Sequence, residues 1–159
     1  MTGKSERRNA TPAASGFMEL ALEQARLAAE RGEVPIGAVV VRNGEVIAEA
    51  GNRTIELKDM TAHAEILALR SAAQVTGSER LSNCDLYVTL EPCTMCAGAI
   101  SFARIRRLYF AAADEKGGGV EHGVRFFSSP QCHHAPEIYS GIHGDAAASL
   151  LQEFFRDRR

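Results

Sequence analysis

The most constraining feature of this sequence is a pair of short motifs, H-x-E and P-C-x-x-C, that together resemble the two halves of one metal site. The first motif contains His63 and Glu65, and the second contains Cys93 and Cys96. Imidazole nitrogen and cysteine sulfur are both common zinc ligands. A fold that uses the two motifs together must bring the histidine beside the two cysteines. The glutamate then remains as a carboxylate that need not touch the metal.

The length and composition favour one globular domain. The 159 residues suffice for a single hydrophobic core, and we expect a domain over residues 16–159 after a flexible leader, residues 1–15, that has little to bury. No apolar run approaches the ~20 residues of a membrane span, and the leader lacks the apolar segment of a secretory signal. We therefore expect a cytoplasmic location, where cysteines bind metals or catalyse reactions more often than they form disulfides.

The first half of the domain is predicted to form a helix and a hairpin. Apolar residues recur at helical spacing from Phe17 to a glycine cap at Gly32. Residues 36–41 and 45–48 flank Asn43-Gly44, the dipeptide that favours a type I′ hairpin turn. The first of these strands is apolar throughout, so we expect it to lie in the centre of a sheet.

The second half alternates helices with strands. A helix with Thr61 as its N-cap is predicted to end near Gly77, followed by a strand at 84–90, a helix at 93–102 and a strand at 105–110. This alternation predicts a layered α/β domain with parallel pairing among the later strands.

The pattern is least clear after the last of these strands. The triplet Gly117–Gly119 is expected to be mobile, and the pair Phe126–Phe127 is expected to anchor a short turn or helix. Residues 137–142 are expected to form a last strand, and residues 146–155 a terminal helix with Asp145 as its cap.

The spacing of the two cysteines suits a single ion. Two residues three apart at a helix start lie on one face and can each bind a metal at about 2.3 Å. Three protein ligands leave a fourth position for water, whose pKa falls from 15.7 toward about 7 on zinc, and Glu65 would carry protons for that water. One difficulty is that residues two apart lie about 200° apart on a helix, so His63 and Glu65 reach one site only if the metal sits over the helix end.

The alternative is a structural zinc site with four protein ligands. It would recruit one of Cys84, Cys132, His133 or His134, but it leaves Glu65 without a role. The first of these cysteines lies in an apolar run and is expected to be a small buried side chain. The other three residues are too closely spaced for a second metal site, so a loop with surface histidines is expected.

With these motifs in place, the sequence resembles the bacterial tRNA-specific adenosine deaminases of the cytidine deaminase superfamily. The resemblance covers about residues 17–159 and is carried by Glu33–Val39, Gly51–Arg53, Thr61–Ile66, Ala68–Arg70, Leu86–Ala99, Asp114-x-Lys116-x-Gly118 and Phe154–Arg156. It implies a three-layer fold with a mixed five-stranded sheet, a homodimer and one zinc ion per chain. The chain departs from the family pattern in residues 117–136, which would flank a bound strand.

The resemblance also implies a substrate, the wobble adenosine of a tRNA anticodon stem-loop, converted to inosine with release of ammonia. Carried over position by position, it implies that His63, Cys93 and Cys96 hold zinc, Glu65 shuttles protons, Asn52 and Ala64 bind the nucleoside, Asp114 contacts the neighbouring nucleotide, and Arg156 faces the RNA stem.

Charge and chemistry leave two other functions open. A formal net charge of −2 excludes a general positive field for nucleic acid, so RNA contact must be local. Two arginine clusters could provide it: Arg104, Arg106 and Arg107, and Arg156, Arg158 and Arg159. The first alternative is a deaminase of a free base or nucleotide, such as guanine, cytidine or deoxycytidylate. The second is a non-catalytic, zinc-stabilised RNA-binding module.

Overall fold

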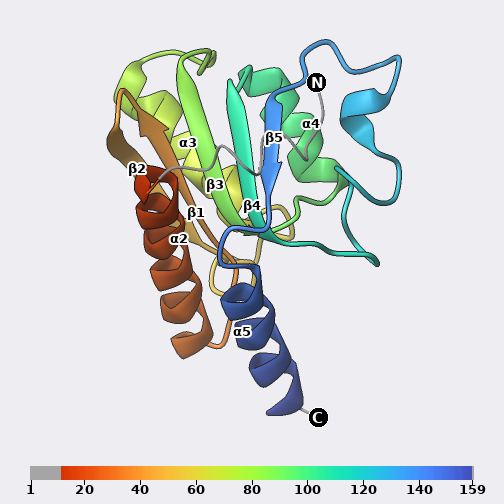
Figure 1. Cartoon of the computed structure of the whole chain (residues 1–159). Helices are drawn as coiled ribbons and strands as arrows, with labels where there is room; N and C mark the ends of the chain where they lie inside the picture. The colour runs from red at the N-terminus through yellow and green to blue at the C-terminus, as the bar shows by residue number, and fades with distance from the viewer. Residues whose placement is uncertain (1–11, 159) are drawn as a thin grey trace.

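Five strands form one mixed sheet in the computed structural model, which describes residues 12–158 (Figure 1). The strand order is β2-β1-β3-β4-β5. Strand β1 (Gly37–Arg42) is antiparallel to both β2 (Glu45–Gly51) and β3 (Cys84–Leu90). Strands β3, β4 (Arg107–Ala112) and β5 (Glu137–Ser140) are parallel, so their carboxyl ends lie at one edge of the sheet. The α/β class and the mixed five-stranded sheet are thereby confirmed.

Helices cover both faces of this sheet (Figure 1). Helices α2 (Pro12–Glu30) and α5 (Gly144–Arg156) lie on one face, and α3 (Ala64–Thr76) and α4 (Thr94–Ala103) lie on the other. A short 3-10 helix, η1 (Phe126–Ser128), packs beside α4. Each face has its own apolar cluster, which makes three layers and explains why β1 and β3 are apolar on both sides.

The predicted hairpin is confirmed in type and position. Asn43 and Gly44 have φ angles of 54° and 77°, the two positive values that a type I′ turn requires. Strand β1 lies between β2 and β3, so it is central as its uniform apolar character indicates.

The first helix begins earlier than the sequence pattern indicates. Helix α2 starts at Pro12, so the expected leader is wrong for residues 12–15, while residues 1–11 lie outside the described part of the chain. Proline suits a first helical position because its missing N–H would have no partner there. Ala14 is buried within the α2 face of the core, which gives this extra turn a packing partner.

Two predicted helix caps are wrong. The N–H and hydroxyl of Thr61 both donate to Asp59 Oδ1, at 2.9 and 2.7 Å, and the N-cap of α3 is His63. The N-cap of α5 is His143, in the left-handed region with φ 57°, and Asp145 lies in the first helical turn. In each case a polar side chain near the helix start bonds locally or faces solvent, and another residue makes the transition into the helix.

The glycine triplet is packed at two of its three positions, which contradicts the expected mobility. Gly118 and Gly119 are buried. A Cβ at Gly118 would lie 2.5 Å from both the Asp114 carbonyl oxygen and the Glu91 side chain, and a Cβ at Gly119 would lie 2.7 Å from Thr94 N. These glycines are needed for close approach of the backbone.

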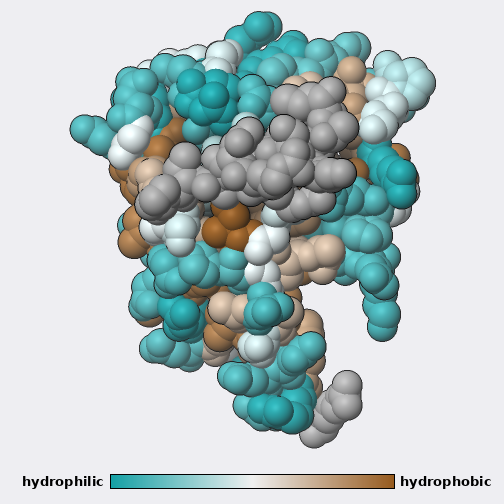
Figure 2. Space-filling model, viewed as in Figure 1, coloured by the Kyte–Doolittle hydropathy of each residue, from teal (hydrophilic) through white to brown (hydrophobic). Residues whose placement is uncertain are grey.

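The outer surface of α2 and α5 is mainly hydrophilic, and hydrophobic side chains show chiefly where the helices meet the sheet (Figure 2). Within residues 12–158, no helix combines the length and apolar character needed to cross a lipid bilayer.

Candidate metal centre and active site

Two helix N-termini meet on one face of the sheet and carry the residues of the two motifs into a single site. His63 is the N-cap of α3 and Cys93 is the N-cap of α4, and both have extended backbone angles. Neither side chain caps its own helix, so both are available to the site. His63 therefore lies outside the helical spiral, and the objection that it cannot share a face with Glu65 no longer applies.

The free N–H at the start of α3 is satisfied by a residue from another part of the chain. Asn52, which directly follows β2, accepts a hydrogen bond at its Oδ1 from Ala64 N at 2.8 Å. Arg31 Nη2 donates to the Asn52 carbonyl at 3.1 Å, and the Asn52 N–H donates to the Ile36 carbonyl at 3.2 Å. Asn52 thus replaces the capping bond that His63 does not make.

The three candidate ligand atoms are spaced as a tetrahedral metal requires. His63 Nδ1 lies 3.7 Å from Cys93 Sγ and 3.5 Å from Cys96 Sγ, and all three atoms lie within 4.8 Å of one another. Metal–ligand bonds of 2.0–2.3 Å at tetrahedral angles separate ligand atoms by roughly 3.3–3.8 Å. The three residues predicted from the sequence therefore form a group that can hold one metal ion.

The electrostatics of the group favour metal binding. The hydrogen bond from Cys96, followed by that from His63, lowers the pKa of Cys93 to about 4. The same hydrogen bond to Cys93, together with burial, raises the pKa of Cys96. One sulfur is therefore ionised at neutral pH without a metal, and the other gives up its proton when a cation replaces it.

Glu65 is a buried carboxyl group with one oxygen that has no hydrogen-bond partner among the described residues. The residue is 3 % exposed, lies in the first turn of α3, and its Oε1 has no hydrogen-bond partner among the described residues. Burial raises the pKa of this carboxyl to about 7. An unpartnered, buried carboxyl is unfavourable for stability, and a pKa near neutral suits a group that both accepts and gives protons.

The cluster opens into a small cavity of about 160 Å³. Its lining residues come from the ends of β3 and β4 and from the two helix starts, and they are Ile36, His63, Glu65, Leu90, Glu91, Cys93, Asp114 and Gly117. The volume is below the ~300 Å³ at which pockets for drug-sized ligands begin, so it suits one small planar group.

Of the other candidate site residues, only Asp114 lines this cavity. Its Oδ1 accepts hydrogen bonds from the N–H groups of Lys116 and Gly117, at 3.2 and 2.9 Å, and so shapes the loop after β4. Asn52 and Ala64 lie directly behind the cluster, in the hydrogen bond that starts α3. Arg156 is exposed in the last turn of α5 and does not line the cavity. The substrate contacts of these residues remain predictions.

The first arginine cluster lies at the wrong edge of the sheet for the site. Arg106 makes two hydrogen bonds to the Asp85 carboxylate, at 3.0 and 3.1 Å, and Arg107 pairs with Glu137 at 3.4 Å. These residues stand at the amino ends of the parallel strands, whereas the cavity lies at their carboxyl ends. Their charges are paired with carboxylates of the neighbouring strands.

The four-ligand alternative is not supported. Within residues 12–158, the only group of three or more side chains found with metal-ligand spacing is that of His63 and the two cysteines. Cys84 is fully buried in the core, as expected. Cys132 contacts Ser101 and the His134 carbonyl, and His134 Nε2 donates to the Ile105 carbonyl at 2.7 Å.

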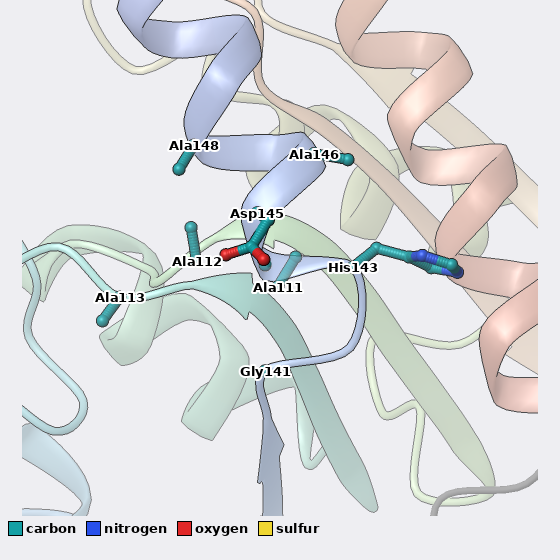
Figure 3. Close-up of a pocket in the computed structure, with 9 residues that line it drawn as sticks. Ala111, Ala112, Ala113, Gly141, His143, Asp145, Ala146 and Ala148 are labelled. Atoms are coloured by element: carbon teal, nitrogen blue, oxygen red, sulfur yellow. The ribbon is translucent and has the colours of Figure 1, made fainter.

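A larger hollow of about 700 Å³ lies at the start of α5, away from the metal-ligand group (Figure 3). It is lined mostly by alanine side chains and main chain, and Asp145 is the only carboxylate among its lining residues. The His143 side chain points away from it, toward α2, where its ring bonds Ser15 at 2.9 Å. This hollow carries no acid, base and ligand combination comparable to that of the smaller cavity.

Sequence reasoning missed Glu91, a buried carboxylate in the cavity wall. It follows β3 directly and accepts hydrogen bonds from the loop after β4. The available signal was an acidic residue between a buried strand and the P-C-x-x-C motif, a position where burial demands partners.

Comparison with known proteins agrees with this geometry. Residues 14–159 match the family model described as MafB19-like deaminase. The chain is 66 % identical over 143 residues to the tRNA-specific adenosine deaminase of Agrobacterium fabrum, which covers 90 % of this chain and 94 % of that protein. It is 41 % identical over 143 residues to the protein of the same name from Bacillus subtilis, covering 90 % and 89 %.

Solved structures give the same relationship. One, from studies of A-to-I editing by tRNA:A34 deaminases at the wobble position of transfer RNA, matches with a TM-score of 0.85 and 66 % identity, covering 86 % of this chain and 99 % of that chain. A guanine deaminase from Nitrosomonas europaea matches with a TM-score of 0.77 and 29 % identity, covering 91 % and 85 %.

Proposed function

This chain belongs to the tRNA-specific adenosine deaminases, a membership from which we propose that it converts the wobble adenosine of a tRNA anticodon to inosine with release of ammonia. The observation that carries the proposal is the unpartnered, buried Glu65 oxygen beside a histidine and two cysteines at metal-ligand spacing, in a cavity small enough for one base.

The donor set fits zinc. His63, Cys93 and Cys96 would hold one Zn²⁺ per chain, and three protein ligands are what a catalytic site uses. When bound, zinc supplies the Lewis acidity that makes water nucleophilic at neutral pH. The helix N-termini that carry the ligands also stabilise the thiolates.

Glu65 would move the protons that hydrolytic deamination requires. The reaction consumes one water and releases one ammonia, so a proton must leave the attacking water and protons must reach the purine ring nitrogen and the departing amino group. Glu65 projects into the cavity from the first turn of α3, is buried, and is not one of the three ligands. It is the group placed to accept the first proton and return it.

Asn52 is proposed to hold the base, as the family resemblance implies. Because its Oδ1 already accepts the Ala64 N–H, the amide nitrogen is the end left to donate to an acceptor on the substrate. Ala64 has its N–H engaged in the same bond, and its proposed contact with the nucleoside follows from the family resemblance. Asp114, which lines the cavity, would meet the neighbouring nucleotide.

The function is tested with matched RNA substrates. Purified protein is incubated with an anticodon stem-loop that has adenosine at the wobble position, with the same stem-loop carrying guanosine there, and with guanine, cytidine and deoxycytidylate. Ammonia release and inosine, read by sequencing, are expected only for the adenosine stem-loop. Ammonia from a free base or nucleotide alone would replace the tRNA proposal, and no ammonia from any substrate would favour a non-catalytic role.

Arg156 is proposed to contact the RNA stem. Helix α5 leaves the carboxyl edge of the sheet, where the cavity also lies, and Arg156 is exposed in its last turn. We predict that Arg156→Ala raises the KM for the stem-loop and lowers the slope of log affinity against log salt by about 0.7–0.9, the value of one phosphate contact. Arg80→Ala, at an exposed site before the amino end of β3, is the matched control and should leave the slope unchanged.

If instead the two arginine variants give the same salt slope as the wild type, Arg156 is an ordinary surface residue and the RNA path must lie elsewhere. Arg158 extends the same helix end but also lies over the Phe154 ring at 3.6 Å, which makes it a poorer test. Arg159 lies outside the described residues. A tRNA substrate would place the reaction in the cytoplasm.

A homodimer is proposed from the family resemblance, with the α3–α4 face as the contact. Phe102 on α4 is 77 % exposed, beside a largely apolar groove of about 430 Å³ lined by α3 and α4. A second copy would remove this ring from water. Phe102→Asp is predicted to yield a monomer in light scattering after size-exclusion chromatography. Phe155→Asp on α5, across the sheet, should retain the wild-type mass, and equal masses for all three proteins would contradict the assignment.

A further inference from the structure

Glu91 has every acceptor position of its carboxylate occupied by the protein. Its Oε1 accepts hydrogen bonds from Asp114 N at 3.0 Å and from His122 Nδ1 at 2.8 Å. Its Oε2 accepts three more, from the N–H groups of Val120, Glu121 and His122, at 3.1, 2.8 and 3.1 Å. The residue is 2 % exposed. A carboxylate filled in this way has no free lone pair for a metal or a substrate, so Glu91 does not take part in the chemistry.

The same five bonds hold both ends of one segment. Asp114 begins the segment two residues after the end of β4, and His122 ends it, so one carboxylate closes residues 114–122 into a loop. Inside the loop, the Gly118 N–H donates to the Asp114 carbonyl at 2.9 Å and the Gly119 N–H donates to the Pro92 carbonyl at 2.8 Å. The loop is therefore tied to the strand end that precedes Cys93.

This loop is one wall of the cavity. Asp114 and Gly117 line it, together with Glu65 and two of the candidate metal ligands, His63 and Cys93. Gly118 is held so close that a Cβ would lie 2.5 Å from the Glu91 carboxyl, which leaves the wall little room to shift. The position of Asp114 relative to Glu65 is thus set by Glu91, which is not one of the three candidate metal ligands.

We propose that Glu91 is a positioning residue that fixes the 114–122 loop as the substrate-binding wall and thereby sets how tightly the substrate is held. The inference rests on the proposed function only in taking the cavity as the substrate site. The attachment of this loop to Glu91 is read from the hydrogen bonds of this chain.

Glu91→Gln tests the proposal with almost no change in volume. A carboxamide presents an NH₂ group to backbone N–H donors at one of its two ends, so two or three of the five bonds are lost. Amide hydrogen exchange at Val120, Glu121 and His122 is expected to accelerate about tenfold or more, while β3 and α4 keep their protection. The KM for the adenosine stem-loop is expected to rise about tenfold with a smaller change in kcat, and zinc content should stay at the wild-type level.

Two further variants complete the design. Gly118→Ala pushes the loop away from the Glu91 carboxyl and should produce the same pair of changes if Glu91→Gln does not fold. Glu45→Gln removes an exposed carboxylate from the start of β2, outside the cavity lining, and should change neither exchange nor KM.

The inference is overturned if Glu91→Gln keeps its amide protection, or if protection is lost and KM stays at the wild-type value. It is also overturned if kcat falls while KM and protection are retained, because that would give Glu91 a role in the chemical step. The exchange comparison does not depend on catalysis. A wild-type protein that deaminates no RNA, together with a loop that loosens in Glu91→Gln, would refute the proposed function and still support the attachment of the loop.

Discussion

Replacing Glu65 with alanine is expected to lower turnover of the adenosine stem-loop by about 10²–10⁴-fold, the contribution of a positioned acid and base. Zinc should remain at about one ion per chain, because Glu65 is not one of the three candidate ligands. The fold should also survive, since the removed carboxyl is buried with an oxygen that has no protein partner. Single-turnover kinetics and metal analysis on the same preparation measure both quantities.

Glu65→Gln is the matched variant. It keeps the size of the side chain but cannot exchange a proton, so its turnover should fall with that of Glu65→Ala, whereas a purely steric role would leave it active. Loss of zinc in either variant would mean that Glu65 holds the metal, and the assignment of the open ligand position would then be wrong.

Replacing Cys93 with alanine is expected to remove the metal and, with it, all turnover. Two of three protein ligands remain in this variant, and the sulfur that is most readily ionised is the one that is lost. The metal would join the N-termini of α3 and α4, so its loss should also lower the unfolding temperature and loosen both helix starts. Metal analysis, thermal unfolding and hydrogen exchange report the three effects.

Cys132→Ser provides the control for cysteine loss, because Cys132 lies outside the ligand group and contacts Ser101 and the His134 carbonyl. It should keep zinc and turnover. In the wild type, a strong chelator should abolish turnover and added zinc should restore it. Full zinc occupancy in Cys93→Ala would show that a fourth side chain completes the site, which the open-site interpretation does not allow.

Features that depend on neighbouring residues could be predicted from the sequence. The type I′ turn follows from the conformational freedom of Asn43-Gly44, and the C-cap of α3 follows from Gly77, whose φ is 70°. The strand limits Cys84–Leu90 agree with the predicted ones because a mainly apolar run rich in strand-forming residues there is followed by Pro92. These preferences depend on the residue and its immediate neighbours, so they do not require contacts with the rest of the chain.

Features that depend on distant segments could not be predicted from the sequence. The cap for α3 comes from Asn52 across the chain, which leaves His63 free to face the cysteines. The packed glycines depend on Glu91, and the pairing of Arg106 depends on Asp85 in the neighbouring strand. A single sequence shows a glycine or an arginine at each position, but not the group that it will meet.

By itself, then, the sequence determined the chemistry of this protein: which side chains can bind a metal, which carboxyl can move protons, and the alternation of strands and helices that carries them. Only the tertiary structure decided the geometry, which includes the meeting of two helix N-termini, the isolation of one Glu65 oxygen, and a loop closed by Glu91. The physical reason is that ligand chemistry and backbone preference belong to individual residues and their neighbours, whereas burial and hydrogen-bond partners exist only once remote segments have packed together.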